Sequence, residues 1–333
     1  MIKKRQAQTL SCVIPGLNEA ENLPALMPVL VAKLCELVPD FEIIFVDDGS
    51  TDATPLVIEQ LRQTYPQLVY LQLSRNFGKE LALTAGLDHV DSDAAVVLDA
   101  DGQDPPELIP ALVAKWREGY DVVYGTRTRR DGETWLKRFS AAAFYRVMTW
   151  LSRTDIPRDT GDFRLMSRPV LDALRGLRER QRFMKGLFTW VGFRQVSFPY
   201  ERESRMAGRT SFNYWKLWNL ALEGITSFST VPLRLATYLG VFTALAAFGW
   251  GLWIIIRTLV WDDPVQGWPS LMTVVLFLGG LQLVALGIIG EYLGRLYMEA
   301  KQRPLYLIRE MHGPAPPVGG TSVPKPFAEK LRD

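Results

Sequence analysis

Two aspartates separated by one residue, Asp99 and Asp101, follow the apolar run AAVVL. Because alternate side chains of an extended chain point the same way, both carboxylates can reach one site. Hard oxygen ligands of this kind suit Mg²⁺ or Mn²⁺, which can bridge two phosphates and stabilise a leaving diphosphate. Gln103 can add a ligand or a water contact. Acids that cap a turn after a strand produce the same triplet, so both interpretations stay open.

A second acidic group, DDGSTD at residues 47–52, follows the apolar run FEIIFV. The Asp48 carboxylate can accept hydrogen bonds from a base or a ribose hydroxyl, and Gly49 permits close approach of the backbone. The alternative is that this segment only turns the chain and caps the next helix. Pro15 and Glu19 mark an equally polar end of the first apolar run, which favours a binding site.

The elements that must position these residues alternate from about Leu10 to Thr126. Continuous apolar runs, typical of strands covered on both faces, are separated by helical patterns of about a dozen residues. This order predicts an α/β doubly wound, mostly parallel sheet, in which ligands bind at the carboxyl ends of the strands. Those ends read PGLNE, DDGS, DADGQ and GTR, and they are polar where the strand bodies are not.

Two later segments carry no charge, over 22 residues at 235–256 and 24 residues at 267–290. At about 1.5 Å per residue, each is long enough to cross a hydrocarbon core of roughly 30 Å. A pair of buried core helices is the alternative, although such helices are seldom uncharged for so long. The two spans predict a transmembrane hairpin, and the positive-inside rule places both flanks in the cytoplasm because basic residues gather there: Lys216, Arg234, Arg295, Lys301, Arg303 and Arg309.

Composition sets further bounds. The 38 basic and 36 acidic residues leave a net charge of +2, which argues neither for a nucleic-acid binder nor for an acidic tail, and we expect no nucleic-acid partner. Cys12 and Cys35 lie in apolar patterns without a zinc-site spacing, so we expect both to be reduced core thiols. Residues 1–8 lack the features of a signal peptide, which predicts a cytoplasmic catalytic part.

We therefore divide the chain into four parts. A cytoplasmic catalytic domain is expected at 1–212, a juxtamembrane amphipathic helix at 213–232 and the transmembrane hairpin at 233–292. A cytoplasmic helix and a flexible tail are expected at 293–333. The aromatic and basic segment 135–153 is either a second helix at the headgroup level or an ordinary helix packed on the sheet.

The order of the motifs resembles the family 2 glycosyltransferases of GT-A fold: VIPxxNE (13–19), VDDGSTD (46–52), DADGQDPP (99–106) and TGDFRL (160–165). Later motifs make the chain similar to the polyprenyl-phosphate glycosyltransferases, the group of dolichol-phosphate mannose synthase and the bactoprenol glucosyltransferases: residues 205–211, PLR (232–234) and GEYLGR (290–295). The resemblance covers most of the chain. It implies an inverting enzyme of the inner membrane that transfers a sugar from a nucleotide donor to polyprenyl phosphate.

The resemblance also assigns roles to residues. It implies that the base and ribose of the donor contact Pro15, Leu17, Glu19, Val46 and Asp48. The metal and the diphosphate would be held by Asp99, Asp101 and Gln103, and Asp101 would act in catalysis through the metal. Phosphate groups would meet Arg127, Arg205, Arg209 and Ser211, where the planar fork of arginine suits pairs of phosphate oxygens.

The chain departs from the family pattern in two places. A lysine is usual after Gly-x-Ser in the segment that follows Arg205, but this sequence reads Gly-Arg-Thr-Ser at 208–211. Arg209 either replaces the charge of that lysine or faces solvent. The usual leucine of DADLQ is Gly102 here, which should loosen the loop without abolishing the site.

Asp162 resembles the residue proposed as the base in bacterial relatives. A phosphate monoester with a second pKa near 6 is already largely ionised at neutral pH, so a strong base is unnecessary. The alternatives are that Asp162 orients the acceptor or pairs with Arg164.

UDP-glucose is the first choice of donor by resemblance, followed by UDP-GlcNAc, other UDP-sugars and GDP-mannose. A homotetramer is plausible by the same resemblance, and two spans are too few to form a sugar-translocation path, which implies a separate flippase. One rival is a processive polysaccharide synthase, which needs a QxxRW motif that this sequence lacks. A non-catalytic membrane scaffold is the other rival, and the intact Asp99, Asp101 and Asp162 argue against it.

Overall fold

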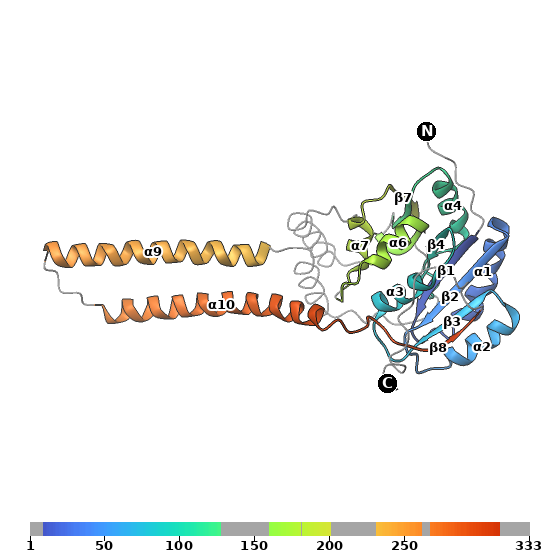
Figure 1. Ribbon diagram of the computed structural model, residues 1–333, viewed down its shortest axis with the longest axis horizontal. Helices are drawn as coiled ribbons and strands as arrows, with labels where there is room; N and C mark the ends of the chain where they lie inside the picture. Colours follow the sequence, from blue (N-terminus) through green and yellow to red (C-terminus); the bar gives the residue numbers. More distant parts are fainter. Residues whose placement is uncertain (1–8, 128–159, 181, 201–230, 262–266, 314–333) are drawn as a thin grey trace, which may run out of the picture.

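The computed structural model describes residues 9–127, 160–180, 182–200, 231–261 and 267–313. Within these residues, eight strands form one sheet in the order β7-β5-β6-β4-β1-β2-β3-β8 (Figure 1). Their bounds are β1 Thr9–Gly16, β2 Asp40–Asp47, β3 Leu68–Leu73, β4 Ala94–Val97, β5 Val122–Arg127, β6 Thr160–Ser167, β7 Gln195–Tyr200 and β8 Ile308–His312.

The middle of the sheet is parallel. β1 pairs in parallel with β2 and with β4, and β2 pairs in parallel with β3. β6 then enters antiparallel between β4 and β5, β7 pairs in parallel with β5, and β8 closes the other edge antiparallel to β3. The predicted α/β class with a mostly parallel, GT-A-like sheet is thereby confirmed.

Helices cover both faces of the sheet, as the continuous burial of its strands requires. One core cluster joins the sheet to α1 (Leu23–Leu37), α2 (Thr54–Thr64) and α4 (Ile109–Arg117), which follows the short helix η1 (Pro106–Leu108). The other cluster joins the opposite face to α3 (Lys79–His89), α6 (Arg168–Gly176) and α7 (Met184–Trp190). The molecule is therefore a three-layer sandwich of helices, sheet and helices.

The prediction that both cysteines are core thiols is wrong for Cys35. Cys12 is fully buried on β1, but Cys35 is exposed on α1. The buried residues of α1 repeat at helical spacing and end with Leu34. Because successive helical residues are rotated by about 100°, the position after Leu34 falls beside the buried stripe and faces solvent.

Helix α3 lies unusually close to the sheet. A Cβ atom added at Gly86 would be 2.3 Å from Val13 Cγ1 on β1 and 3.0 Å from Val46 Cγ2 on β2. No real side chain tolerates such a distance without movement of its neighbours. The glycine therefore sets the depth of α3 and, with it, the place of the first residue of that helix, Lys79.

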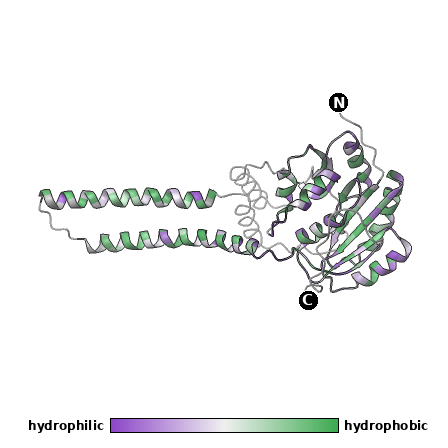
Figure 2. Cartoon of the chain, in the orientation of Figure 1, coloured by the Kyte–Doolittle hydropathy of each residue, from purple (hydrophilic) through white to green (hydrophobic). Residues whose placement is uncertain are grey.

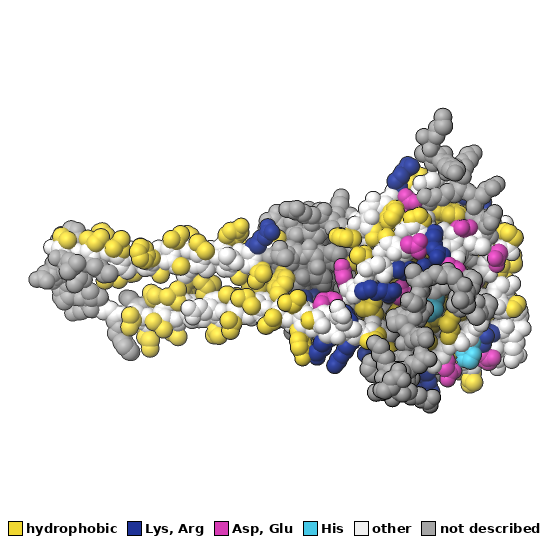
Figure 3. Space-filling model, viewed as in Figure 1, with side chains coloured by type: hydrophobic (Ala, Val, Ile, Leu, Met, Phe, Trp, Pro, Cys, Tyr) yellow, Lys and Arg dark blue, Asp and Glu magenta, His cyan; other side chains and the backbone are white. Residues whose placement is uncertain are grey.

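Two long helices project from the sandwich and lie side by side, α9 (Val231–Trp261) and α10 (Trp268–Ala300) (Figure 1). Both extend beyond the predicted spans. They contain candidate membrane spans at Leu233–Ile254 and Leu271–Ala300, with mean hydropathy 1.5 and 2.3 and no buried share in either window. Figure 2 shows hydrophobic residues around both helices, and Figure 3 shows charged side chains gathered on the sandwich instead.

Their surfaces would be unfavourable in water. Phe242 on α9 is 72% exposed and Leu276 on α10 is 71% exposed, within apolar surfaces that run the length of both helices. Soluble monomers rarely carry apolar patches of more than a few hundred Å². The hairpin therefore requires an apolar environment, which supports association with a membrane.

The chain returns to the sandwich after α10. Glu299 near the end of α10 accepts a hydrogen bond of 2.7 Å from the backbone N–H of Arg180, and Tyr306 donates one of 2.8 Å to Asp88. β8 then adds to the sheet beside β3. The region 293–333, expected as a helix and tail, thus contains a sheet strand. The expected helices at 135–153 and 213–232 lie outside the described residues, apart from the first residues of α9.

Candidate active site

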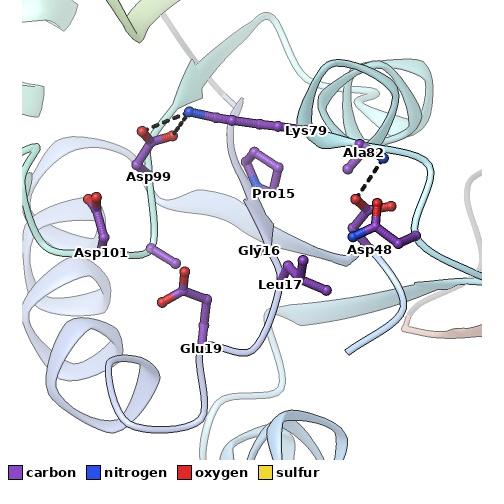
Figure 4. A pocket seen from close by; sticks show the side chains of 12 residues that line it. Pro15, Gly16, Leu17, Glu19, Asp48, Lys79, Ala82, Asp99 and Asp101 are labelled. Atoms are coloured by element: carbon purple, nitrogen blue, oxygen red, sulfur yellow. Dashed lines mark hydrogen bonds and ion pairs between the residues drawn. The ribbon is translucent and has the colours of Figure 1, made fainter. Parts of the chain in front are cut away.

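A pocket of about 290 Å³ lies at the carboxyl ends of β1, β2 and β4, next to the start of α3. Parallel strands present their carboxyl ends at one edge, so the polar segments that follow them meet there. Figure 4 shows the side chains around this pocket. Four of the five residues predicted for the base and ribose line it, together with two predicted for the metal: Pro15, Leu17, Glu19, Asp48, Asp99 and Asp101.

Asp48 lines the pocket and also binds the backbone of the loop before α3, which forms another part of the pocket. Its two carboxylate oxygens accept hydrogen bonds from the backbone N–H groups of Phe77 and Gly78, at 2.7 and 2.8 Å. Burial raises the pKa of Asp48, and these two hydrogen bonds oppose that effect. The loop that leads into α3 is therefore tied to the end of β2.

The neighbouring Asp47 has a different role. It is fully buried, and it accepts hydrogen bonds from Ser50 N–H at 2.7 Å and from Tyr70 Oη at 2.8 Å. Gly49 has φ +76°, and a Cβ there would be 2.6 Å from the carbonyl carbon of Arg75. The segment 47–52 thus turns the chain and brings the loop at residue 75 close to the site. A turn was one of the two interpretations that the sequence left open for this segment.

Glu19 connects the first strand end to the acidic side of the pocket. Its Oε2 accepts a hydrogen bond of 2.7 Å from Asn22. Burial raises the pKa of Glu19, the hydrogen bond from Asn22 opposes this, and the negative charges of Asp101 and Asp99 raise it further. These carboxylates therefore share one electronegative region, which favours cations.

Asp99 and Asp101 lie just beyond β4. Asp99 Oδ1 is buried and accepts no hydrogen bond, although an ammonium lies near it. Asp101 Oδ1 accepts a hydrogen bond of 3.2 Å from Gln103 N–H, and Gly102 between them has φ +72°. The loop thus turns on a glycine and presents carboxylate oxygens of the kind that a hard cation prefers.

The fit to a divalent cation is partial without a substrate. Among the described residues, no group of three His, Cys, Asp or Glu side chains is placed to hold a metal ion. Mg²⁺ typically binds through one or two carboxylates together with substrate phosphates and water. Asp99 and Asp101 fit that pattern, with the remaining ligands left to a diphosphate.

Two predicted residues are not among those that line the pocket. Val46 is fully buried in the core cluster below α3, and Gln103 is not among the pocket's described lining residues. Arg127 is the last residue of β5, but its side chain lies outside the described part of the chain, as do Arg205, Arg209 and Ser211. Their predicted roles stay predictions.

Lys79 belongs to the site and was missed from the sequence. Its Nζ lies 2.7 Å from Asp99 Oδ1 and 2.6 Å from Asp162 Oδ2, so one ammonium joins two carboxylates. The segment SRNFGKE follows β3 just as the acidic motifs follow β2 and β4. We expected the site where polar segments follow the strands. The same rule applied to β3 would have identified this segment, which contains Lys79.

The sheet explains why Asp162 lies opposite Asp99. The antiparallel ladder between β4 and β6 ends with Val97 paired to Arg164, and each aspartate is two residues beyond that pair, at the same end. Like charges in such positions repel. The ammonium of Lys79 offsets that repulsion.

The Asp162 side chain is 15% exposed. Burial by itself would raise the pKa of Asp162, but the positive charges of Lys79 and Lys185 outweigh it and lower the pKa to about 2. Arg164 donates a hydrogen bond of 2.9 Å to the backbone oxygen of Gly161, and its guanidinium carbon lies 3.7 Å from the centroid of the Phe188 ring. Asp162 is therefore an ionised group held by lysine.

A second half-buried acid, Glu80, follows Lys79 on α3. Glu80 accepts a hydrogen bond of 3.0 Å from the N–H of Met184 at the start of α7. Burial, followed by the negative charge of Asp162, raises the pKa of Glu80 to about 7. Glu80 thus connects α3 to α7 below the pocket.

Comparisons with known proteins agree with this geometry. Residues 11–175 match the model for Glycosyl transferase family 2, and residues 231–296 match that for the GtrB C-terminal hairpin. The uncharacterised glycosyltransferase sll0501 of Synechocystis sp. is 52% identical over 91% of this chain and 96% of its own length. The SfII prophage-derived bactoprenol glucosyl transferase of Shigella flexneri is 49% identical over 91% of this chain and 98% of its own.

Solved structures are more distant. Glucosyl-3-phosphoglycerate synthase from Mycobacterium tuberculosis, in complex with Mn²⁺ and UDP-glucose, is 22% identical with a TM-score of 0.44, over 66% of this chain and 77% of that one. The two matching family models and the near full-length relatives, in contrast, show that this chain belongs to glycosyl transferase family 2 and carries the GtrB C-terminal hairpin.

Proposed function

We propose that the protein transfers a sugar, with glucose as the first choice, from a nucleotide donor to polyprenyl phosphate. The observation that carries the proposal is the pocket that unites Asp48 and Glu19 with Asp99 and Asp101, in a chain whose relatives include bactoprenol glucosyl transferases. The exposed apolar hairpin adds support, because a long isoprenoid acceptor is found in a membrane.

In this reaction the acceptor phosphate oxygen attacks the anomeric carbon of the sugar as the bond to the nucleoside diphosphate breaks. Attack from the opposite side inverts the configuration, and no covalent intermediate on the enzyme is needed. Pro15, Leu17 and Asp48 would bind the base and ribose, and the carboxylate of Asp162 would orient the acceptor. Positioning of this kind can supply a large part of the rate enhancement.

Asp99 and Asp101 would hold Mg²⁺ or Mn²⁺, with Gln103 as a further ligand or a contact through water. When bound, the divalent cation supplies positive charge to the diphosphate, whose negative charge grows as it leaves. The arginines outside the described side chains, Arg127 and Arg205, would meet the remaining phosphate charge.

For the topology, we propose a multi-pass protein of the inner membrane. The catalytic domain at 1–212 and both termini would lie in the cytoplasm, and α9 and α10 would cross the membrane as a hairpin within about 233–292. Arg295, Lys301 and Arg303 follow residue 290, where the second span predicted from the sequence ends, and this is the arrangement that the positive-inside rule favours for a cytoplasmic flank. A tetramer and a separate flippase for the lipid-linked product complete the proposal.

The decisive experiment incubates the purified full-length protein with undecaprenyl phosphate, a divalent cation and separate donors: UDP-glucose, UDP-GlcNAc and GDP-mannose. We expect one lipid-linked monosaccharide, formed best from UDP-glucose. Formation of a polymer would instead support a processive synthase. Absence of transfer and of donor hydrolysis with every donor would support a non-catalytic scaffold.

A further inference from the structure

Lys79 lies between Asp99, which we propose as a metal ligand, and Asp162, which we propose orients the acceptor. Its Nζ is 2.7 and 2.8 Å from the two oxygens of Asp99 and 2.6 Å from Asp162 Oδ2. Figure 4 shows the lysine reaching across the pocket from α3 to Asp99. The ammonium, which has three hydrogen-bond donors, therefore contacts two carboxylates. Asp99 follows β4, and Asp162 belongs to β6.

The backbone of Lys79 is fixed, whereas its side chain is partly exposed. Lys79 is the first residue of α3, directly after Gly78, whose N–H is bound by Asp48 and whose φ is +96°. The close packing at Gly86 fixes the same helix against the sheet. The lysine side chain is 47% exposed, so the compact charge at the end of its flexible stem can shift without opening the core.

A divalent cation and the ammonium of Lys79 compete for the carboxylate of Asp99. A divalent cation needs the carboxylate oxygens that Lys79 now contacts, and it would repel an ammonium bound to the same group. Asp99 Oδ1 is buried and receives no hydrogen bond. Among the described residues, its negative charge is offset by the ammonium of Lys79, 2.7 Å away. A cation that binds there must displace the lysine.

The displaced ammonium has a use in the pocket. Among the described residues that line it, Lys79 is the only Lys or Arg, and the neighbouring acids are Glu19, Asp48, Asp99 and Asp101. A phosphate dianion that enters such a region meets repulsion unless a positive charge faces it. Asp162 Oδ2, 2.6 Å from the ammonium, would keep the lysine within the site when a cation binds to Asp99.

We propose that Lys79 is a resident counter-ion that the divalent cation displaces from Asp99, after which its ammonium, still held by Asp162, binds the acceptor phosphate. The inference rests on the proposed function, and it adds Lys79 as a residue that binds substrate. In the ligand-free enzyme the lysine keeps two opposed carboxylates together. In the loaded enzyme it exchanges one carboxylate for a phosphate oxygen.

The test is a titration of the full-length protein in detergent with Mn²⁺ alone, followed by the electron paramagnetic resonance of free Mn²⁺. We expect Lys79→Met to bind Mn²⁺ about threefold to tenfold more tightly than the unmodified protein, since a partly exposed ion pair no longer competes. Lys79→Gln is a second neutral variant, and Lys79→Arg keeps the competing charge. Lys33→Met, which removes an exposed pair with Glu36 on α1, is the matched control and should change nothing.

A kinetic measurement tests the second half of the exchange. In Lys79→Met the KM for undecaprenyl phosphate should rise about tenfold or more, whereas the KM for the nucleotide sugar at saturating Mn²⁺ should stay within about twofold. A purely structural role for the lysine would change both constants together. Thermal unfolding of each variant shows whether the fold is retained.

The outcomes separate this inference from the proposed function. Equal or weaker Mn²⁺ binding by the neutral variants overturns the exchange, while the metal site and the transfer reaction stand. No Mn²⁺ binding by any form of the protein overturns the exchange and the proposed metal site together. An unchanged KM for the acceptor overturns the assignment of the freed ammonium to the phosphate.

Discussion

Replacement of Asp162 by Asn separates a catalytic base from a group that positions the acceptor. The lysine contact at 2.6 Å holds the pKa of Asp162 at about 2, well below its ordinary value. The second pKa of a phosphate monoester is near 6, so the two groups differ by about four pH units. At about 1.4 kcal/mol per unit, transfer of a proton from the acceptor to this carboxylate would be uphill by about 5–6 kcal/mol.

Asp162 is therefore a poor base for the acceptor proton, and none is needed, because the acceptor has already lost that proton to bulk solution and is mostly a dianion above about pH 6. The expected defect of Asp162→Asn is one of placement, because Lys79 loses one of its two carboxylates. A misplacement of about 1 Å can cost about 10²-fold in rate, and we expect a loss of that order. The loss should be similar from about pH 6 to pH 8, since the charge of the acceptor is not limiting.

Initial rates with undecaprenyl phosphate and UDP-glucose, measured at several pH values, provide the assay. The matched control is Asp172→Asn on α6, an exposed aspartate that pairs with Arg168 and Arg175 far from the pocket. It should retain almost full activity. If Asp162→Asn recovered to the unmodified rate by pH 8, the reasoning would be refuted and the base role restored.

Further expectations concern the metal, the packing, the pH dependence and the topology. Asp99→Asn should abolish transfer and metal-dependent donor binding in a folded protein, which equilibrium binding with and without Mg²⁺ measures; near-normal turnover contradicts it. Gly86→Ala should lower the free energy of unfolding by about 1–3 kcal/mol relative to Gly176→Ala, where no atom lies within 4 Å, and equal thermal stability contradicts it. The pKa of Glu80 is raised to about 7, so its neutral form stabilises the fold below about pH 4.5 and this contribution is lost as the pH rises through about 7. Glu80→Gln should therefore flatten the pH dependence of Tm, and an unchanged slope contradicts it. A reporter inserted near residue 262 should be accessible from outside intact cells while tags at both termini are protected; an accessible terminus contradicts the hairpin.

Local sequence pattern was sufficient for most of the sandwich. The helical patterns of about a dozen residues expected between the apolar runs correspond to helices such as α2 and α3, each of 11 residues. Apolar runs marked the parallel strands because each is buried on both faces, and the polar residues after them marked the edge that forms the pocket. These features depend on short stretches of chain, so the sequence contains them.

The helices of the hairpin were recognised, but their length was underestimated. The predicted span of 22 residues lies within α9, which has 31 residues, and all but the first of the 24 residues of the second span lie within α10, which has 33. The absence of charge marks only the part that suits a hydrocarbon core. The backbone continues its helical hydrogen bonds past Arg257 in α9 and past Glu291 and Arg295 in α10.

By itself, the sequence determined the fold class, the acidic strand ends and the apolar hairpin, because each follows from residues close together in the chain. Only the tertiary structure placed β6 antiparallel between β4 and β5, and this register sets Asp162 opposite Asp99. It also brought Lys79 between them from α3, and β8 to the edge of the sheet. Contacts between residues so distant in sequence depend on strand order, register and the depth of a packed helix, which no local period encodes.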